Sequence, residues 1–198
     1  MSWNLAESPV YPLRSLDRRK KVSCAQNLWT EIKDYIELAE VVACYVARAA
    51  EKLRSQDSQA AFLTVFLRTN HLNKFIPHYE NSHTIRLPFP TSFTPDLITS
   101  ALKGLKAIFQ DGFQYKKAGV MLSKITPLAH VQPDLFGEVS LFDYYRKRKL
   151  MTVVDAINAI YGRDNLYFAV QGSIRTWKMR QSKLSGHFTT QWSEILTM

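Results

Sequence analysis

The fold is decided by residues 61–70, AFLTVFLRTN, because apolar and polar side chains alternate there with the period of a β-strand. One face of this strand would carry Leu63, Val65 and Leu67, and the other Thr64, Phe66 and Arg68. One aliphatic face beside one mixed face is typical of an antiparallel sheet covered on a single side. We therefore expect helices against the aliphatic face and Arg68 on an open face.

Two amphipathic segments supply those helices. The first is predicted over residues 36–54, with Asp34 as a possible cap. The second begins with Thr94 as cap and Pro95 in its first turn, and ends before Gly112. The expected buried stripes are Leu38, Val42, Tyr45, Val46, Ala49 and Leu53 in the first helix, and Leu97, Ile98, Ala101, Leu102, Leu105 and Ile108 in the second.

Three further strands complete the unit. They are predicted at residues 20–29, 82–88 and from 115 onward. In the last, Ala118, Val120 and Leu122 would face the helices, while Tyr115 and Lys117 would face away. The sequence thus predicts an α+β fold of order β-α-β-β-α-β over residues 20–127, with both helices on one face of a four-stranded sheet.

The uncovered face is the first candidate site. It would present Arg68, Arg86, Tyr115 and Lys117. Cationic side chains on different strands can reach the phosphates of nucleic acid, and such contacts carry no sequence information. The alternative is that these residues are ordinary solvated side chains of a half-exposed sheet.

Composition agrees with a polyanionic partner. The 198 residues hold 26 Lys and Arg against 17 Asp and Glu, a net charge of +9. Cys24 and Cys44 lack metal-ligand spacing and are too few for a disulfide framework, so we expect a reducing cytoplasm. We expect no membrane span and no secretion signal.

The chain divides into four predicted parts: a tail at 1–19, the sheet unit at 20–127, a linker at 128–145 and a small C-terminal α/β element at 146–198. In the last part, the basic run at 146–149 would precede an amphipathic helix, and NLYFAVQG at 165–172 would form a strand. That helix would contain Leu150, Val153, Ile157 and Ile160. Trp177 and Trp192 lie among cations and could stack on unpaired bases, although core anchors are the commoner role.

Several stretches resemble a known family in order and spacing. ARAAEKLRSQ (47–56), YENSHTIRLPFPTSFTPDLI (79–98) and YKKAGVML (115–122) resemble the C-terminal part of the UmuC-like Y-family DNA polymerases. The resemblance implies a little-finger domain that cradles DNA. The implied DNA-binding residues are Lys20, Lys21, Ser23, Arg68, Arg86, Tyr115 and Lys117. Gln26 stands where the family carries arginine, so one charge-assisted phosphate contact is lost.

The peptide VQPDLFGE (131–138) resembles the sliding-clamp-binding motif of bacterial polymerases. Gln132 can donate and accept hydrogen bonds at a pocket rim, while Leu135 and Phe136 can fill an apolar cleft. Pro133 replaces the usual leucine of the motif. The alternative is that Leu135 and Phe136 staple the linker onto the sheet.

Catalysis is not expected of this chain. The family's metal-binding carboxylates belong to a palm that would precede Lys20, and we predict no catalytic residue, metal or cofactor. No phosphate-binding GxxxxGK(S/T) loop is present, and the five histidines lack ligand spacing. The expected function is non-catalytic binding of damaged DNA and the sliding clamp in SOS-associated translesion synthesis. A UmuD′-like subunit and the recombinase filament are further partners that the resemblance implies.

Two alternatives to this function remain. The chain could be a protein-interaction module or an inactive gene remnant, with an idle basic face. It could instead bind RNA, which the lack of an RNP-type aromatic motif disfavours.

Overall fold

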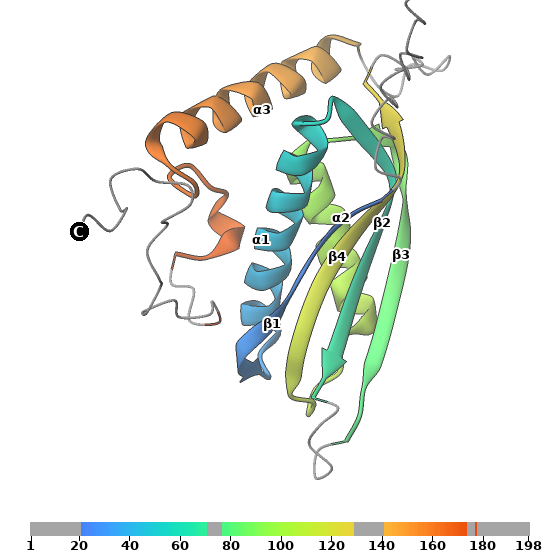
Figure 1. Ribbon diagram of the computed structural model, residues 1–198. Helices are drawn as coiled ribbons and strands as arrows, with labels where there is room; N and C mark the ends of the chain where they lie inside the picture. Colours follow the sequence, from blue (N-terminus) through green and yellow to red (C-terminus); the bar gives the residue numbers. More distant parts are fainter. Residues whose placement is uncertain (1–20, 71–76, 129–140, 174–176, 178–198) are drawn as a thin grey trace, which may run out of the picture.

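The computed structural model describes residues 21–70, 77–128, 141–173 and 177. Its elements are β1 (Lys21–Ile32), α1 (Tyr35–Arg54), β2 (Ser58–Thr69), β3 (Glu80–Thr91), α2 (Thr94–Ile108), β4 (Tyr115–Pro127), α3 (Leu141–Tyr161) and the 3-10 turn η1 (Ala169–Gln171). The four strands form one antiparallel sheet in the order β1-β4-β2-β3 (Figure 1). The α+β fold expected from the sequence is confirmed.

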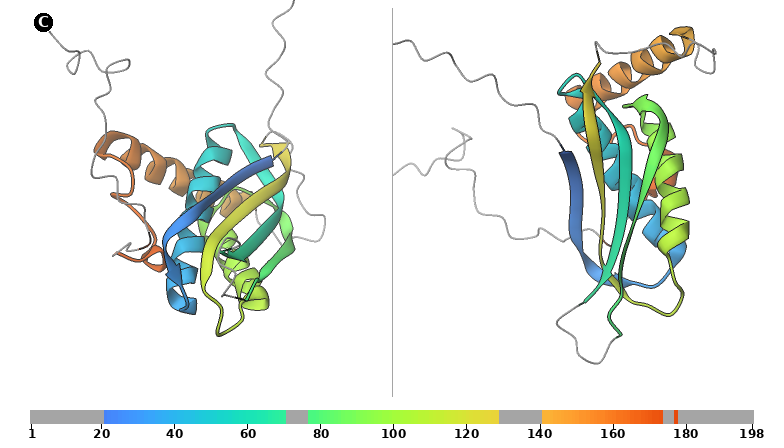
Figure 2. Two further views of the ribbon diagram at one scale, coloured as in Figure 1. Left: turned by 60° about the horizontal axis from the view of Figure 1, so that its bottom comes forward. Right: turned by 90° about the vertical axis from the view of Figure 1, so that its right-hand side faces the viewer.

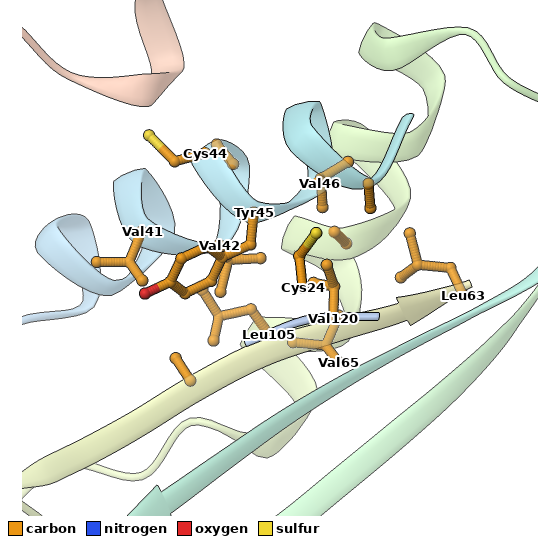
Figure 3. Close-up of a cluster of buried hydrophobic side chains, with 14 of the residues drawn as sticks. Cys24, Val41, Val42, Cys44, Tyr45, Val46, Leu63, Val65, Leu105 and Val120 are labelled. Carbon is orange, nitrogen blue, oxygen red and sulfur yellow. The ribbon is translucent and has the colours of Figure 1, made fainter. Parts of the chain in front are cut away.

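Helices α1 and α2 lie on the same side of the sheet (Figure 2). The aliphatic residues of β2 meet them as predicted, because Leu63, Val65 and Leu67 are fully buried. Their partners from α1, α2 and β4 include Val42, Val46, Leu105 and Val120, which Figure 3 shows in one cluster. Burial of each such side chain contributes about 1.5–3 kcal/mol, so this layer is the main source of stability.

Strand pairing fixes which residues share the opposite face. On β2 these are Phe62, Thr64, Phe66 and Arg68, since they alternate with the buried residues. Reading across the sheet from β1 to β3, three of the rows are Lys21–Ser123–Phe62–Arg86, Ser23–Met121–Thr64–Thr84 and Ala25–Gly119–Phe66–Ser82. In the fourth row Lys117 and Arg68 lie beside Glu80. We call the face made by these rows the open face.

The expected helix stripes are buried except for Leu102, which is partly buried, but the caps differ from expectation. Asp34 occupies the N-cap position of α1 and makes no side-chain capping bond. The N-cap of α2 is Phe93 rather than Thr94. The Thr94 hydroxyl instead accepts a hydrogen bond from Arg54 Nη1 at 2.9 Å, so it joins the two helices. Pro95 does lie in the first turn, and Gly112 follows α2 at φ +90°.

Tyr115 is the clearest correction to the predicted faces. It was expected beside Lys117, yet its side chain is fully buried. Arg68 pairs with Lys117 but Thr69 pairs with Tyr115, so Lys116 is an extra residue in β4. Such a β-bulge shifts the alternation by one position and turns Tyr115 to the helix side. Its hydroxyl accepts from the Gln110 N–H at 2.9 Å and donates to the Gln110 carbonyl at 3.0 Å.

Two described pieces of the C-terminal region, the turn η1 and Trp177, pack against α1. Cys44 points away from the strands in Figure 3, and its Sγ lies 3.4 Å from the Gln171 carbonyl in η1. Trp177 is buried edge-on against Tyr45, with ring centroids 5.8 Å apart, so it is a core anchor. Residues 165–172, predicted as a strand, instead form irregular chain and the turn η1. That strand prediction is wrong.

Helix α3 begins earlier than predicted and presents the unexpected side to α1 and α2. The basic run at 146–149 lies inside the helix rather than before it. Met151 is buried, and Lys147 and Asp155 make ion pairs to α2 and α1. The predicted apolar positions are largely exposed: Leu150 at 52%, Val153 at 50% and Ile160 at 76%. Polar contacts therefore decide which side of α3 packs inward.

We expect Tyr45→Phe to weaken the loss of stability at alkaline pH. Burial raises the pKa of Tyr45 to about 12 from 10.0, and its hydroxyl has no hydrogen-bond partner among the described residues. Between these two values the unfolded chain ionises first, so the free energy of unfolding falls as pH rises. The free energy of unfolding can be measured with denaturant at neutral pH and again midway between the two pKa values. Its decrease between these two pH values should be smaller for the variant than for the unsubstituted protein. A difference equal to that of the unsubstituted protein would contradict this assignment.

Candidate nucleic-acid interface

The open face carries five cationic side chains, which come from all four strands. They are Lys21, Arg68, Arg86, Lys117 and Lys124. Glu80 is the single acidic side chain that the four rows place on this face within the described residues. A surface of this charge balance attracts polyanions at moderate ionic strength.

Most of the predicted DNA-binding residues reach this face. Lys21 and Ser23 are exposed at one edge, and Arg86 is exposed on β3 at the other. Lys117 is half-buried on β4. The open face therefore brings together residues that are separated by up to 96 positions (21 to 117) in the sequence.

Arg68 is the least available of these cations. Its Nε lies 3.4 Å from a carboxylate oxygen of Glu80 on the neighbouring strand, and the pair is partly exposed. A partly exposed pair of this kind is worth about 1 kcal/mol or less, so phosphate can replace the carboxylate. Arg68 thus contributes less net charge to the face than Lys21, Lys117 or Arg86.

The sequence prediction missed Lys124 as a cation of this face and did not list Phe62 or Phe66 among the candidate site residues. Lys124 adopts φ +48°, and its Nζ lies 4.7 Å from the centre of the Phe62 ring. A cation over an aromatic ring is attracted by the ring's quadrupole. The alternation of residues 61–70 predicts that Phe62 and Phe66 lie on the same face as Arg68. Nothing in the sequence predicts the positive φ of Lys124.

The remaining predicted site residues lie outside the described residues. These are Lys20 and the candidate clamp-binding residues Gln132, Leu135 and Phe136. Among the residues that are described, no group of three or more His, Cys, Asp or Glu side chains could hold a metal ion. No helix in the described ranges combines the length and apolar character needed to cross a membrane.

The chain belongs to the impB/mucB/samB family: residues 19–135 match the model of the family's C-terminal domain. Residues 148–198 match a second model, a domain of unknown function, DUF4113. The family resemblance predicted from the sequence is confirmed.

Among its curated relatives, the chain is 36% identical over 178 residues to protein UmuC of Salmonella typhimurium. That alignment covers 90% of this chain and 42% of the relative. Protein ImpB of Salmonella typhimurium is 33% identical and protein MucB of Escherichia coli 30%, each over 89% of this chain and 41% of the relative. The chain thus spans about two fifths of the length of these relatives.

Two solved structures that match part of this chain do so at TM-scores below 0.5. An insertion ternary complex of Dbh DNA polymerase matches with a TM-score of 0.45 and 14% identity, over 54% of this chain and 29% of that one. The little finger domain of PolIV, solved in complex with the beta-clamp processivity factor, matches with a TM-score of 0.38 and 17% identity. That match covers 58% of this chain and 97% of the other.

Proposed function

We propose that this chain is a non-catalytic, DNA-holding part of a UmuC-like translesion polymerase. In this role the open face binds the phosphate backbone of DNA, including damaged DNA. The observation that carries the proposal is the gathering of Lys21, Arg86 and Lys117 on one sheet face. Among the described residues, α1 and α2 lie on the other side of the sheet, and Glu80 is the single acid in the rows of this face. Contacts from separate strands to phosphate oxygens would fix the position of DNA without reading its sequence.

The family of the chain supports the same role. Its UmuC, ImpB and MucB relatives are longer, and the matched region contains the sheet unit. We place the chain in the cytoplasm, since two cysteines are too few for a disulfide framework. Its family relatives suggest a role in SOS-associated DNA repair and mutagenesis. The DNA-directed polymerase activity is assigned to a palm that is not among the matched domains.

Docking on the sliding clamp is the second part of the proposal. It depends on Gln132, Leu135 and Phe136, whose residue types suit a pocket with a polar rim and an apolar floor. A linear peptide of this size binds in the micromolar range, about −8 kcal/mol. The chain would then hold DNA with one surface and the clamp with another.

The DNA-binding role is tested by removing charge from the open face. We expect the triple variant Lys21→Ala, Arg86→Ala, Lys117→Ala to bind duplex DNA about a hundredfold more weakly, since each contact to phosphate is worth roughly 1 kcal/mol or more. Fluorescence anisotropy with a labelled duplex measures this change.

The matched control removes the same charge elsewhere. Lys103 and Lys106 on α2 and Lys149 on α3 are exposed and lie off the open face. Their triple alanine variant has the same net charge as the first and should retain most of the affinity. Equal losses in the two variants would mean that net charge, rather than the open face, determines binding.

A further inference from the structure

The ring of Phe66 lies along the sheet instead of standing away from it. Gly119 is its cross-strand neighbour on β4, and a Cβ placed on Gly119 would be 2.4 Å from Phe66 Cζ. Directly opposed Cβ atoms in a sheet are about 4.5–5.5 Å apart, so the ring must extend sideways across β4 to reach that position. Glycine at 119 is what provides the space for the ring.

The rest of this row is small as well. Ala25 follows on β1, with its Cβ also 2.4 Å from a Cβ placed on Gly119, and Ser82 flanks Phe66 on β3. Small neighbours on both sides leave the Phe66 ring as the largest apolar group in the middle of the open face. The row is therefore a shallow platform with an aromatic surface.

Cations border this platform on two sides. Lys117 and Arg68 lie one row away in one direction. Two rows away in the other direction are Lys21, Arg86 and the Phe62 ring under Lys124. Successive rows are about 6.6–6.8 Å apart, so phosphates on either side of a base that rests on Phe66 would be within reach of these side chains.

A duplex makes no use of this aromatic ring, because its bases are paired and stacked inside the helix. An unpaired strand has free base faces, and a base stacks on an aromatic side chain whatever its identity. The cations around the ring favour this occupant over a neutral or basic protein segment.

We propose that the open face binds single-stranded DNA by stacking one unpaired base on Phe66, with flanking phosphates held by Lys117, Lys21 and Arg86. This inference rests on the proposed DNA-binding function and specifies its substrate as an unpaired strand. Phe62 is less available for stacking because Lys124 already covers its ring.

The test measures the affinity of two proteins for each of two oligonucleotides. The proteins are the unsubstituted chain and Phe66→Leu, which keeps an apolar side chain and removes the aromatic face. The oligonucleotides are a short oligothymidylate and the same strand with abasic sites, which has the same phosphates and no bases. Because the second oligonucleotide tests the unsubstituted protein, the test does not depend on how well the variant folds.

Stacking predicts that the unsubstituted protein binds the oligothymidylate about 5- to 150-fold more tightly than the abasic strand. Phe66→Leu should remove most of this preference, leave abasic-strand binding unchanged and leave duplex binding unchanged. The salt dependence should be the same for both proteins, since no phosphate contact is lost.

Two results would overturn the inference alone: equal binding of both strands by the unsubstituted protein, or an undiminished base preference in Phe66→Leu. In either case duplex binding that depends on Lys21, Arg86 and Lys117 would leave the proposed function standing. Absence of binding to both duplex and single strands would remove the proposed function and this inference together.

Discussion

Arg54→Met is expected to lower the free energy of unfolding by about 3 kcal/mol and to detach α3 from the sheet unit. Arg54 makes a bidentate ion pair with Asp155 of α3, with Nε–Oδ2 and Nη2–Oδ1 distances of 2.6 and 2.7 Å. Its Nη1 also donates to the Ser92 carbonyl and the Thr94 hydroxyl, each at 2.9 Å. Removing this one guanidinium leaves a carboxylate and a carbonyl without their donor, which costs more than the bonds themselves are worth.

The α1 helix offers a matched control for this variant. Arg48 also pairs with an aspartate of the C-terminal region, Asp164, but at 3.4 Å and with 41% and 34% of the two side chains exposed. For Arg54 and Asp155 the exposed fractions are 12% and 30%. Arg48→Met should therefore cost about 1 kcal/mol or less. Denaturant unfolding with similar losses for the two variants would show that Arg54 does not hold α3 in place.

The second large effect is expected at the candidate clamp-binding peptide. Leu135→Ala together with Phe136→Ala should remove detectable binding to the cognate sliding clamp. Each side chain would bury roughly 1.5–3 kcal/mol in an apolar cleft, so losing both moves a micromolar dissociation constant by at least two orders of magnitude. Isothermal titration calorimetry with the purified clamp measures the change.

A neighbouring substitution separates this effect from a general disturbance of the linker. Val131→Ala lies just before the motif and should bind the clamp as the unsubstituted chain does. DNA binding should be unchanged in both variants, because neither substitution alters a residue of the open face. If the double variant still binds the clamp, Leu135 and Phe136 are not clamp-binding residues. Their alternative role, packing the linker onto the sheet, would then be favoured.

Much of the sheet unit could be predicted because local alternation and helical periodicity both point to the same core. Leu63, Val65 and Leu67 follow the period of a strand, and all three are buried. Tyr115 does not follow this alternation, because the extra residue Lys116 reverses it. No residue type in the sequence predicts this bulge. The bulge also explains the aromatic cluster behind the sheet, where Tyr115 lies 5.8 Å from Phe109 and 6.0 Å from Tyr79 between ring centroids.

The C-terminal region was less predictable because its packing depends on single long-range contacts. Periodicity identifies α3 as amphipathic but cannot tell which side meets the rest of the protein. Asp155 and Lys147 decide that orientation through partners about 100 and 51 residues away, Arg54 and Asp96. Similarly, residues 165–172 have the composition of a strand but lie at no open sheet edge, so they form a turn against α1.

The candidate interface contains both residues that local alternation predicts and residues that depend on long-range contacts. Arg86 and Lys117 were placed by alternation alone, and the strand register confirms that they share a face. Gly119 beneath the Phe66 ring and Lys124 over Phe62 depend on cross-strand neighbours that only the folded sheet brings together. The sequence therefore predicts that the charges and Phe66 share this face, but it does not predict the space at Gly119 or the contact of Lys124 with Phe62.

If the open face holds DNA through its phosphates, the affinity for DNA must depend strongly on salt concentration. For the unsubstituted chain, the logarithm of the association constant for duplex DNA should fall linearly with the logarithm of salt concentration, with a slope of about −0.9 per phosphate contacted. Each of Lys21→Ala, Arg86→Ala and Lys117→Ala should reduce the magnitude of that slope by about one. Binding that is absent or independent of salt, or slopes that these substitutions leave unchanged, would contradict the account.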